Sequence, residues 1–214
     1  MIIDENVKGY ILSLEEDDSE ILESIRREGL ADEVPIIKRD GAGFLKFAVK
    51  CFKPKKILEV GTAIGYSALL MASVSDACIT TVELDETRAD KAEENIKKAG
   101  ESSRITVLRG DAAVVLAELA KSGETYDMVF LDAAKAQYSA YYKEIRKMVK
   151  PGSIMLVDNV LQDGSAAGSK FAVKRRDRTI HIRMREFIES LNKEEGVSSV
   201  IIPLGDGLML CSFE

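Results

Sequence analysis

Two carboxylates, a carboxamide and a lysine occupy two short motifs, and together their side chains could hold a metal ion and move a proton. Asp132 ends an apolar run and begins Asp132-Ala133-Ala134-Lys135, while Asp158-Asn159 follows a second apolar run. Three oxygen donors (Asp132, Asp158 and Asn159) suit Mg²⁺, Mn²⁺ or Ca²⁺ rather than zinc, which favours nitrogen and sulfur ligands. These residues predict a divalent cation site with open positions for water and a substrate.

Lys135 is the candidate general base. It lies three residues after Asp132, where the next helix is expected to begin. This i,i+3 spacing lets its amine reach the cation site. A helical lysine is ordinarily solvated, but a divalent cation beside it would disfavour the ammonium form, as a general base requires.

A second group of residues follows two earlier apolar runs and indicates a nucleoside cofactor. Glu83 lies 22 residues after Gly61, close to the spacing of about 20 at which an acid binds a ribose diol. A nicotinamide enzyme would show this acid too, but Ala63 replaces the middle glycine of a diphosphate-binding turn. Glu59 would also repel a diphosphate. S-adenosylmethionine, which carries a sulfonium and an amino group, fits an acid at this position better.

Five successive strand-then-helix units must position these residues, because ligands of an open α/β sheet bind at the carboxyl ends of its strands. The apolar runs predict strands over 56–60, 78–83, 105–109, 128–132 and 153–157. Two more segments, 197–203 and 208–213, predict strands joined by a short turn and therefore a mixed edge to the sheet. The acids that this arrangement brings to one edge are Glu59, Glu83, Asp111, Asp132 and Asp158.

The region before the sheet, residues 1–52, has helical periodicity. Ser19 is suited to cap a helix and Gly29 to end it, and a further helix over 40–52 is expected to bury Phe47. These helices are either a lid over the site or part of a dimer surface. We expect one domain over 1–214, in which 53–214 form the core.

Composition narrows the class of protein. The chain has 214 residues, of which 46% are hydrophobic and 31% charged, enough for one domain with a sizeable core. Its net charge of -6 does not suit a polyanion-binding molecule as a whole. Cys51, Cys78 and Cys211 stand apart in apolar surroundings, so each is expected to be buried and reduced. We expect a cytoplasmic protein, because neither a signal peptide nor an apolar run of about 20 residues is present.

Three motifs in order, Leu58–Ser67, Leu131–Lys135 and Val157–Val160, resemble the cation-dependent O-methyltransferases, which include catechol and caffeoyl-CoA O-methyltransferases. The resemblance covers roughly residues 35–214. It implies a Rossmann-like class I S-adenosylmethionine-dependent methyltransferase fold, with a seven-stranded, mostly parallel sheet whose last strand is antiparallel. It implies a cofactor site of Ile37, Glu59, Gly61, Ser67, Glu83, Asp111, Ala112 and Asp132, a metal site of Asp132, Asp158 and Asn159, and catalysis by Lys135 and Asp132.

Within this family, the chain is most similar to bacterial tRNA 5-hydroxyuridine methyltransferases, on Gly61–Ser67, the arginine-rich start of the helix after the loop, and Pro203–Leu208. This resemblance implies formation of 5-methoxyuridine at the wobble position. Met209 stands where catechol O-methyltransferase has a glutamate, which argues against a catechol. The alternative acceptor is a small catechol-like or phenylpropanoid molecule. A silent S-adenosylmethionine-binding module is a third hypothesis, disfavoured because a pure binder needs no base beside a metal.

Charge distribution also bears on the acceptor. The segment from Lys170 to Arg185 contains seven basic residues and one acidic residue, Asp177. A phosphate-contacting rim needs such a concentration, although a solvated helix face would show it too. The lone His181 in this segment is expected to be structural or at the surface. We expect Arg175, Arg176 and Arg178 to contact tRNA if tRNA is the partner, and we expect a homodimer.

Overall fold

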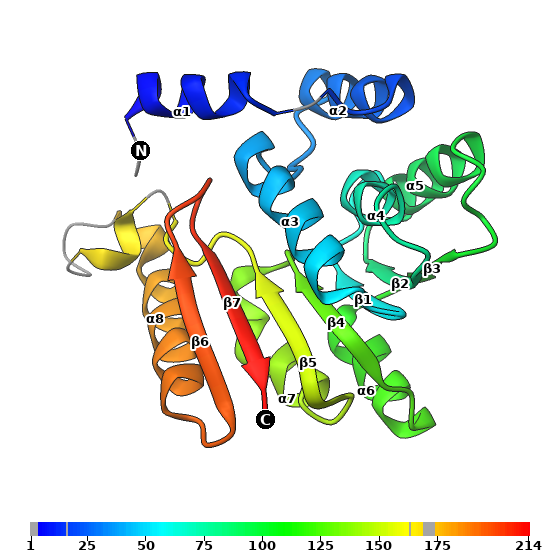
Figure 1. The fold of residues 1–214 in the computed structure, drawn as a ribbon. Helices are drawn as coiled ribbons and strands as arrows, with labels where there is room; N and C mark the ends of the chain where they lie inside the picture. Colours follow the sequence, from blue (N-terminus) through cyan, green and yellow to red (C-terminus); the bar gives the residue numbers. More distant parts are fainter. Residues whose placement is uncertain (1–3, 16, 163, 169–173) are drawn as a thin grey trace.

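The computed structural model describes residues 4–15, 17–162, 164–168 and 174–214 and contains one seven-stranded sheet (Figure 1). The strand order is β3-β2-β1-β4-β5-β7-β6, and β7 runs antiparallel to both of its neighbours. The predicted mostly parallel sheet with an antiparallel last strand is therefore confirmed. The strands are β1 (Lys56–Val60), β2 (Cys78–Glu83), β3 (Ile105–Arg109), β4 (Tyr126–Leu131), β5 (Val149–Val157), β6 (Val197–Ile202) and β7 (Leu208–Phe213).

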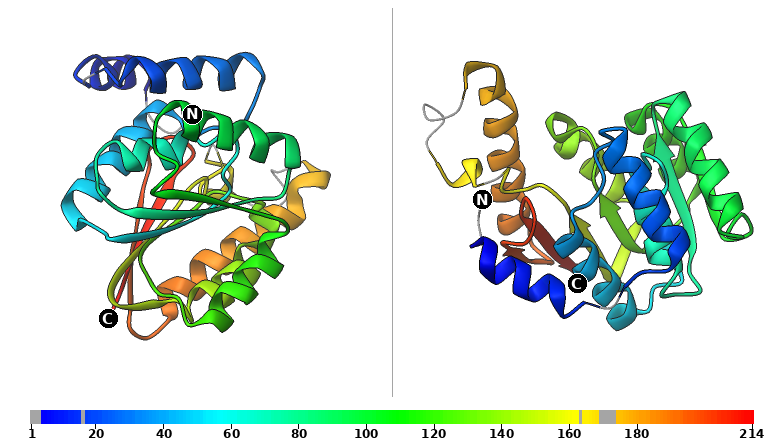
Figure 2. Two further views of the ribbon diagram at one scale, coloured as in Figure 1. Left: turned by 90° about the vertical axis from the view of Figure 1, so that its right-hand side faces the viewer. Right: turned by 90° about the horizontal axis from the view of Figure 1, so that it is seen from above.

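Helices cover both faces of the sheet, which explains why its central strands are continuous apolar runs (Figures 1 and 2). One face carries α3 (Arg39–Phe52), α4 (Tyr66–Ala72) and α5 (Glu86–Lys98). The other carries α6 (Ala112–Ser122), α7 (Tyr138–Ile145) and α8 (Arg178–Lys193). The remaining elements are α1 (Glu5–Ser13), α2 (Glu20–Ala31) and the short 3₁₀ helices η1 (Lys135–Gln137), η2 (Ser165–Ala167) and η3 (Arg175–Asp177).

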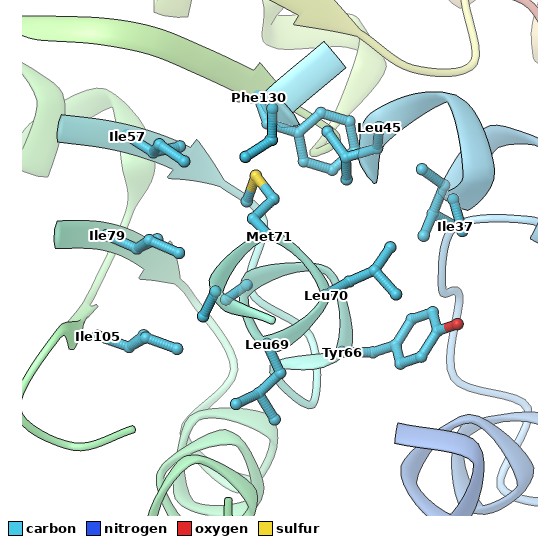
Figure 3. Close-up of a cluster of buried hydrophobic side chains, with 14 of the residues drawn as sticks. Ile37, Leu45, Ile57, Tyr66, Leu69, Leu70, Met71, Ile79, Ile105 and Phe130 are labelled. Carbon is cyan, nitrogen blue, oxygen red and sulfur yellow. The ribbon is translucent and has the colours of Figure 1, made fainter. Parts of the chain in front are cut away.

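Register places equivalent side chains of neighbouring strands on the same face. Ile57, Ile79 and Ile105 are aligned across β1, β2 and β3. Figure 3 shows them beside Leu70 and Met71 of α4, in the core between the sheet and α3–α5. Full burial of such a side chain contributes roughly 1.5–3 kcal/mol. This packing fixes the strand ends from which the site is built.

The strands agree closely with the sequence-based expectation, and β1, β2 and β3 begin and end at the predicted residues. β4 begins at Tyr126 and ends at Leu131, so Asp132 belongs to the loop that follows it. β5 begins at Val149 rather than at residue 153. Its pairing with β4 shifts register between Tyr126 and Met128, and such an irregularity accommodates the proline and glycine that suggested a turn at 151–152.

The N-terminal helices show one confirmed boundary and one wrong one. The Ser19 hydroxyl accepts the backbone N–H of Leu22 at 3.4 Å and caps α2, as predicted. The prediction that Gly29 ends this helix is wrong, because α2 continues to Ala31. A Cβ at Gly29 would lie 3.0 Å from Cδ1 of Ile64. Gly29 therefore allows α2 to approach the loop after β1.

Other burial predictions fail where one face of an element meets solvent. Phe47 is 62% exposed on α3, and Cys51 and Cys78 are exposed, whereas Cys211 is buried. His181 is buried on α8, which fits the structural alternative expected for it and not the surface one. Apolar neighbours in the sequence do not report burial when the element has an outer face. Among the described helices, none has the length and apolar character needed to cross a membrane.

Candidate active site

A cavity of about 450 Å³ opens at the carboxyl edge of the sheet, a volume within the range typical of sites for small organic ligands. Its walls come from the loops after β1, β2, β3 and β4 and from the segment before α3. Sequence reasoning did not find Arg88 and Tyr141, which also line it. The predicted site residues on its walls are Ile37, Gly61, Ser67, Glu83, Asp111, Ala112, Asp132, Lys135 and Asn159.

Gly61 fits a position that no other residue could occupy. Its φ is +104°, and a Cβ there would lie 1.9 Å from the backbone oxygen of Asp132. Backbone hydrogen bonds from Gly61 to Val82 and from Asp132 to Val60, both 3.0 Å long, join the three strand ends. The turn after β1 can therefore press its backbone against the cavity, as a nucleoside cofactor requires.

Glu83, at the end of β2, is held by the backbone around it. Its Oε2 accepts the N–H of Ala63 at 2.7 Å, and its Oε1 accepts those of Leu84 and Asp85 at 3.1 and 3.0 Å. A carboxylate has about four acceptor positions, so capacity remains for a ribose hydroxyl. Glu83 thus fixes the glycine turn as well as facing the cavity.

Glu59 lies beneath the cavity rather than on its wall. Its side chain is fully buried and accepts the hydroxyl of Thr81, which is 2.6 Å from the hydroxyl of Thr62. Burial raises the pKa of Glu59 to about 7, against the hydrogen bonds from Ser67 and Thr81. Thr62 and Ser67 do line the cavity. The structure therefore gives Glu59 a supporting place under these two residues.

Asp111, after β3, serves first as a helix cap. It is the N-cap of α6, and its carboxylate accepts the N–H of Ala113 at 2.8 Å. The same turn, with Ala112, forms part of the cavity wall. The structure therefore places the predicted Asp111-Ala112 contact at the cavity.

The predicted metal ligands meet because β4 and β5 are neighbours. Nδ2 of Asn159 donates to Oδ1 of Asp132 at 2.9 Å, and the Asn159 N–H donates to Oδ1 of Asp158 at 2.6 Å. Asn159 has a φ of +64°, a conformation that asparagine tolerates better than most residues. Turning its amide about χ2 would present oxygen instead of nitrogen to the same point, and Asn rotamers of this kind are interchangeable in shape.

Electrostatics make this cluster a place for a cation. Burial raises the pKa of Asp132 to about 6, against the hydrogen bond from Asn159 and the charge of Lys135. Burial and then the charge of Asp132 raise the pKa of Asp158 to about 7. In the described part of the chain, no three His, Cys, Asp or Glu side chains are arranged so that they could hold a metal ion by themselves. Two crowded carboxylates and an amide nevertheless fit a hard divalent cation.

Lys135 is brought to the same cavity by η1. Its charge lowers the pKa of both Asp132 and Asp158, so it lies within electrostatic reach of them. Nη1 of Arg183 on α8 donates to the backbone oxygen of Ala136 at 3.2 Å and anchors η1. The structure thus joins the two motifs that the sequence separates.

A smaller hollow of about 220 Å³ lies on the other side of Asp132 and Asn159. It is smaller than the roughly 300–1,000 Å³ of most ligand sites, so it suits a single ring. Sequence reasoning missed two of its charged residues, Lys38 and Asp206, whose Nζ and Oδ1 are 2.5 Å apart. The position of Asp206 between two glycines in the turn before the last strand was the available signal.

The basic segment divides into two parts. Arg175 and Arg176 lie in η3 and are exposed, and Arg178 begins α8. Arg183 and Arg185 donate instead to the backbone oxygens of Ala136 and Gly168. Lys170 lies outside the described residues. The start of the segment therefore offers exposed cations, whereas its later part fastens α8 to the loops of the site.

Comparison with known proteins gives one family. The O-methyltransferase family model matches residues 12–213. Caffeoyl-CoA O-methyltransferase of Stellaria longipes is 34% identical over 172 residues, covering 78% of this chain and 71% of that protein. A crystal structure from Staphylococcus aureus, of a candidate caffeoyl-CoA O-methyltransferase, matches with a TM-score of 0.89 and 30% identity over 99% of this chain and 100% of that one.

A further solved structure is informative about the cofactor. The O-methyltransferase of Bacillus cereus, in complex with SAH, has a TM-score of 0.86 and 26% identity, and covers 98% of this chain and 97% of that one. SAH is the product that remains when S-adenosylmethionine gives up its methyl group. The glycine turn, the cavity beside it and these relatives agree: the chain belongs to the O-methyltransferase family and is an S-adenosylmethionine-dependent enzyme.

Proposed function

We propose that the protein methylates the 5-hydroxyl of 5-hydroxyuridine at the wobble position of tRNA, in a reaction that depends on a divalent metal. The observation that carries the proposal is a hollow of one-ring size together with exposed arginines that precede α8, the helix bonded to η1 through Arg183. η3 runs directly into α8, and Arg183 of α8 bonds the residue after Lys135. In this proposal, Arg175 and Arg176 contact phosphates of the tRNA whose base enters the hollow.

The hollow and the cavity share Asp132 and Asn159, so an acceptor in one faces a donor in the other. Magnesium, or a similar ion held by Asp132, Asp158 and Asn159, would chelate two adjacent oxygens and acidify the hydroxyl among them. In 5-hydroxyuridine these oxygens are the 5-hydroxyl and the 4-carbonyl. The amine of Lys135 takes the hydroxyl proton, and the oxygen then attacks the sulfonium methyl group.

Positioning supplies much of the expected acceleration. Alignment of two bound reactants contributes up to about 7–11 kcal/mol to lowering a barrier. Here the turn at Gly61 and the wall at Glu83 would hold the cofactor, while Ile37 borders both compartments. The methyl group would pass across the boundary formed by Asp132 and Asn159.

A small catechol-like or phenylpropanoid acceptor is the second candidate. It also presents two adjacent oxygens, and the name of the Stellaria longipes relative supports it. The structure weakens the argument from Met209 against a catechol acceptor. This side chain is fully buried on β7 and lines neither compartment. The acceptor must therefore be decided by experiment.

Salt dependence of binding tests the tRNA proposal. Replacing Arg175, Arg176 and Arg178 together with Ala should flatten the dependence of tRNA affinity on salt by roughly one unit for each phosphate that the variant no longer binds. Methylation of free catechol by the same variant should stay close to the wild-type rate, because a neutral ring needs no phosphate contact. A matched control replaces three exposed lysines at the opposite edge of the sheet, Lys50, Lys53 and Lys55, with Ala.

Two results would decide against tRNA. One is an unchanged salt slope together with a collapse of catechol turnover in the arginine variant. The other is the absence of any new 5-methoxyuridine, by mass spectrometry of nucleosides, after undermethylated tRNA is incubated with enzyme, S-adenosylmethionine and Mg²⁺.

A further inference from the structure

The turn between β6 and β7 is fastened on two sides, which gives Asp206 a fixed place. The N–H of Gly205 donates to Oδ2 of the buried Asp40 at 3.0 Å. On the other side, the backbone oxygen of Asp206 accepts the N–H groups of Leu161 and Gln162 at 2.9 and 3.1 Å. The turn thus joins the segment at the start of α3 to the loop that follows the predicted metal ligands.

The side chain of Asp206 lies in the acceptor hollow with Asp132 and Asp158. After burial and the charge of Asp132, the charge of Asp206 is a further cause that raises the pKa of Asp158. Lys38 holds Oδ1 of Asp206 in an ion pair, in which the two side chains are 47% and 18% exposed. A carboxylate has about four acceptor positions and can accept more than one donor at the same time.

We propose that Asp206 is a specificity-determining residue, whose carboxylate accepts a hydrogen bond from a donor on the acceptor ring beside the two chelated oxygens. This inference rests on the proposed function and names the ring chemistry that the site selects. In 5-hydroxyuracil the consecutive ring positions carry a hydroxyl, a carbonyl and the N3–H. In catechol the corresponding positions carry a hydroxyl, a hydroxyl and a C–H. Asp206 therefore distinguishes the pyrimidine from the catechol.

The carboxylate of Asp206 also weakens the binding of anionic acceptors. Asp132, Asp158 and Asp206 all border the hollow, so a ring that carries a carboxylate near Asp206 meets repulsion. Specificity of this kind combines an attractive contact for one ligand with a repulsive one for another. A neutral catechol meets neither effect, because Lys38 keeps Asp206 paired when the ring offers no donor. The enzyme should therefore prefer an acceptor ring with a hydrogen-bond donor beside Asp206, then a neutral ring without such a donor, and last a ring that carries a negative charge there.

Asp206→Ala tests the attractive contact. The readout is the ratio of kcat/KM for an anticodon stem-loop RNA containing 5-hydroxyuridine to kcat/KM for catechol. Loss of a hydrogen bond to a charged acceptor should lower this ratio about 10- to 100-fold, while kcat/KM for catechol changes less than about 3-fold. Asp206→Asn, which keeps a neutral acceptor oxygen, should lie between the wild type and Asp206→Ala. It also replaces the alanine variant if the latter does not fold.

Two control variants separate specificity from structure. Lys38→Met breaks the same ion pair but keeps the carboxylate, so the RNA-to-catechol ratio should not fall below the wild-type value. Asp18→Asn removes an ion pair of similar geometry, Lys46–Asp18 at 2.6 Å, whose residues do not line the hollow, and should also leave the ratio unchanged. If Lys38→Met lowers the ratio as much as Asp206→Ala does, the ion pair matters only structurally and the inference is overturned.

A second pair of acceptors keeps the inference testable if the enzyme does not methylate RNA. Wild-type enzyme should prefer catechol to 2,3-dihydroxybenzoate, whose carboxylate is next to the two hydroxyls, and Asp206→Ala should narrow this preference about 10-fold. That result supports the role of Asp206 even where the tRNA proposal has failed. Unchanged preferences in Asp206→Ala, for whichever pairs the wild type accepts, would overturn the inference.

Discussion

The two compartments of the site are built in different ways. The cofactor cavity is formed by the loops that directly follow β1, β2, β3 and β4 and by the segment before α3. The acceptor hollow is formed by parts far apart in the chain, the segment before α3, the loops after β4 and β5, and the turn before β7. The first compartment is therefore built mainly from loops that directly follow parallel strands, whereas the second also needs the antiparallel turn before β7.

Their polar groups differ in the same way. Glu83, on the cofactor side, is satisfied by three backbone N–H groups. Asp132 and Asp158, on the acceptor side, are costly to ionise because both are buried, and the charge of Asp132 adds to the cost for Asp158. The cofactor compartment is therefore complete as folded, while the acceptor compartment is arranged around a positive charge that has to be supplied.

Removal of the divalent metal should have the largest effect, and it should affect the acceptor compartment but not the cofactor compartment. EDTA should abolish methyl transfer, and Mg²⁺ or Mn²⁺ should restore it, because the metal would orient and acidify the acceptor. S-adenosylmethionine affinity, measured by calorimetry in EDTA, should survive, since Gly61 and Glu83 need no metal. Full turnover in the chelator would show that the acid cluster is not a metal site.

Lys135→Ala should lower kcat by about 10²- to 10⁴-fold, the range for loss of a general base. S-adenosylmethionine affinity should hardly change, because the amine serves the acceptor. Lys143→Ala, on the next helix, is the matched control and should keep wild-type turnover. An unfolded Lys135→Ala protein would instead assign Lys135 a structural role.

The contrast between compartments also explains what the sequence could reveal. Glu83, Asp132 and Asp158 were identifiable because each directly follows an apolar strand, and parallel strands bring their carboxyl ends to one edge. Asp206 had only the two glycines beside it as a signal, because the place of its turn depends on contacts with Asp40 and Leu161, which are distant in sequence.

The sequence also did not show how deeply an individual residue lies below the cavity. Glu59 follows the same strand-end rule as Glu83, yet Thr81 on the neighbouring strand holds it below the cavity. Glycine is typical of helix ends, but Gly29 lies inside α2, where the absence of a side chain allows close packing against Ile64. A local pattern predicts which edge a residue occupies, but only the packed neighbours determine whether it faces ligand or core.

Glu83→Ala should weaken S-adenosylmethionine binding by about 1.5–3 kcal/mol, through the loss of charge-assisted hydrogen bonds. Catalysis at saturating cofactor should be affected less, because the acceptor compartment is intact. Glu86→Ala removes a neighbouring exposed acid that pairs with Arg109 and serves as the control. Equal calorimetric affinities for Glu83→Ala and Glu86→Ala would exclude a direct contact between Glu83 and the cofactor.

The smallest effect should be a pH-dependent change in stability of the metal-free protein. The pKa of Asp158 is raised from 3.8 to about 7. A group with a raised pKa in the folded state contributes stability below its unfolded pKa and loses that contribution as pH rises through the folded pKa. Metal-free wild-type protein should therefore lose stability between about pH 4 and pH 7. Asp158→Asn, which cannot ionise, should lose less over this window.

Thermal unfolding in EDTA measures this difference, with about 2–4 °C of Tm expected per kcal/mol for a chain of this size. The Tm of Asp158→Asn relative to wild type should be higher at pH 8 than at pH 5. Saturating Mg²⁺ at pH 8 should reverse the order, because a ligand that binds only the folded wild type stabilises it. If the Tm difference is the same at both pH values and in Mg²⁺, the acceptor compartment holds no unbalanced charge, and the contrast between the two compartments disappears.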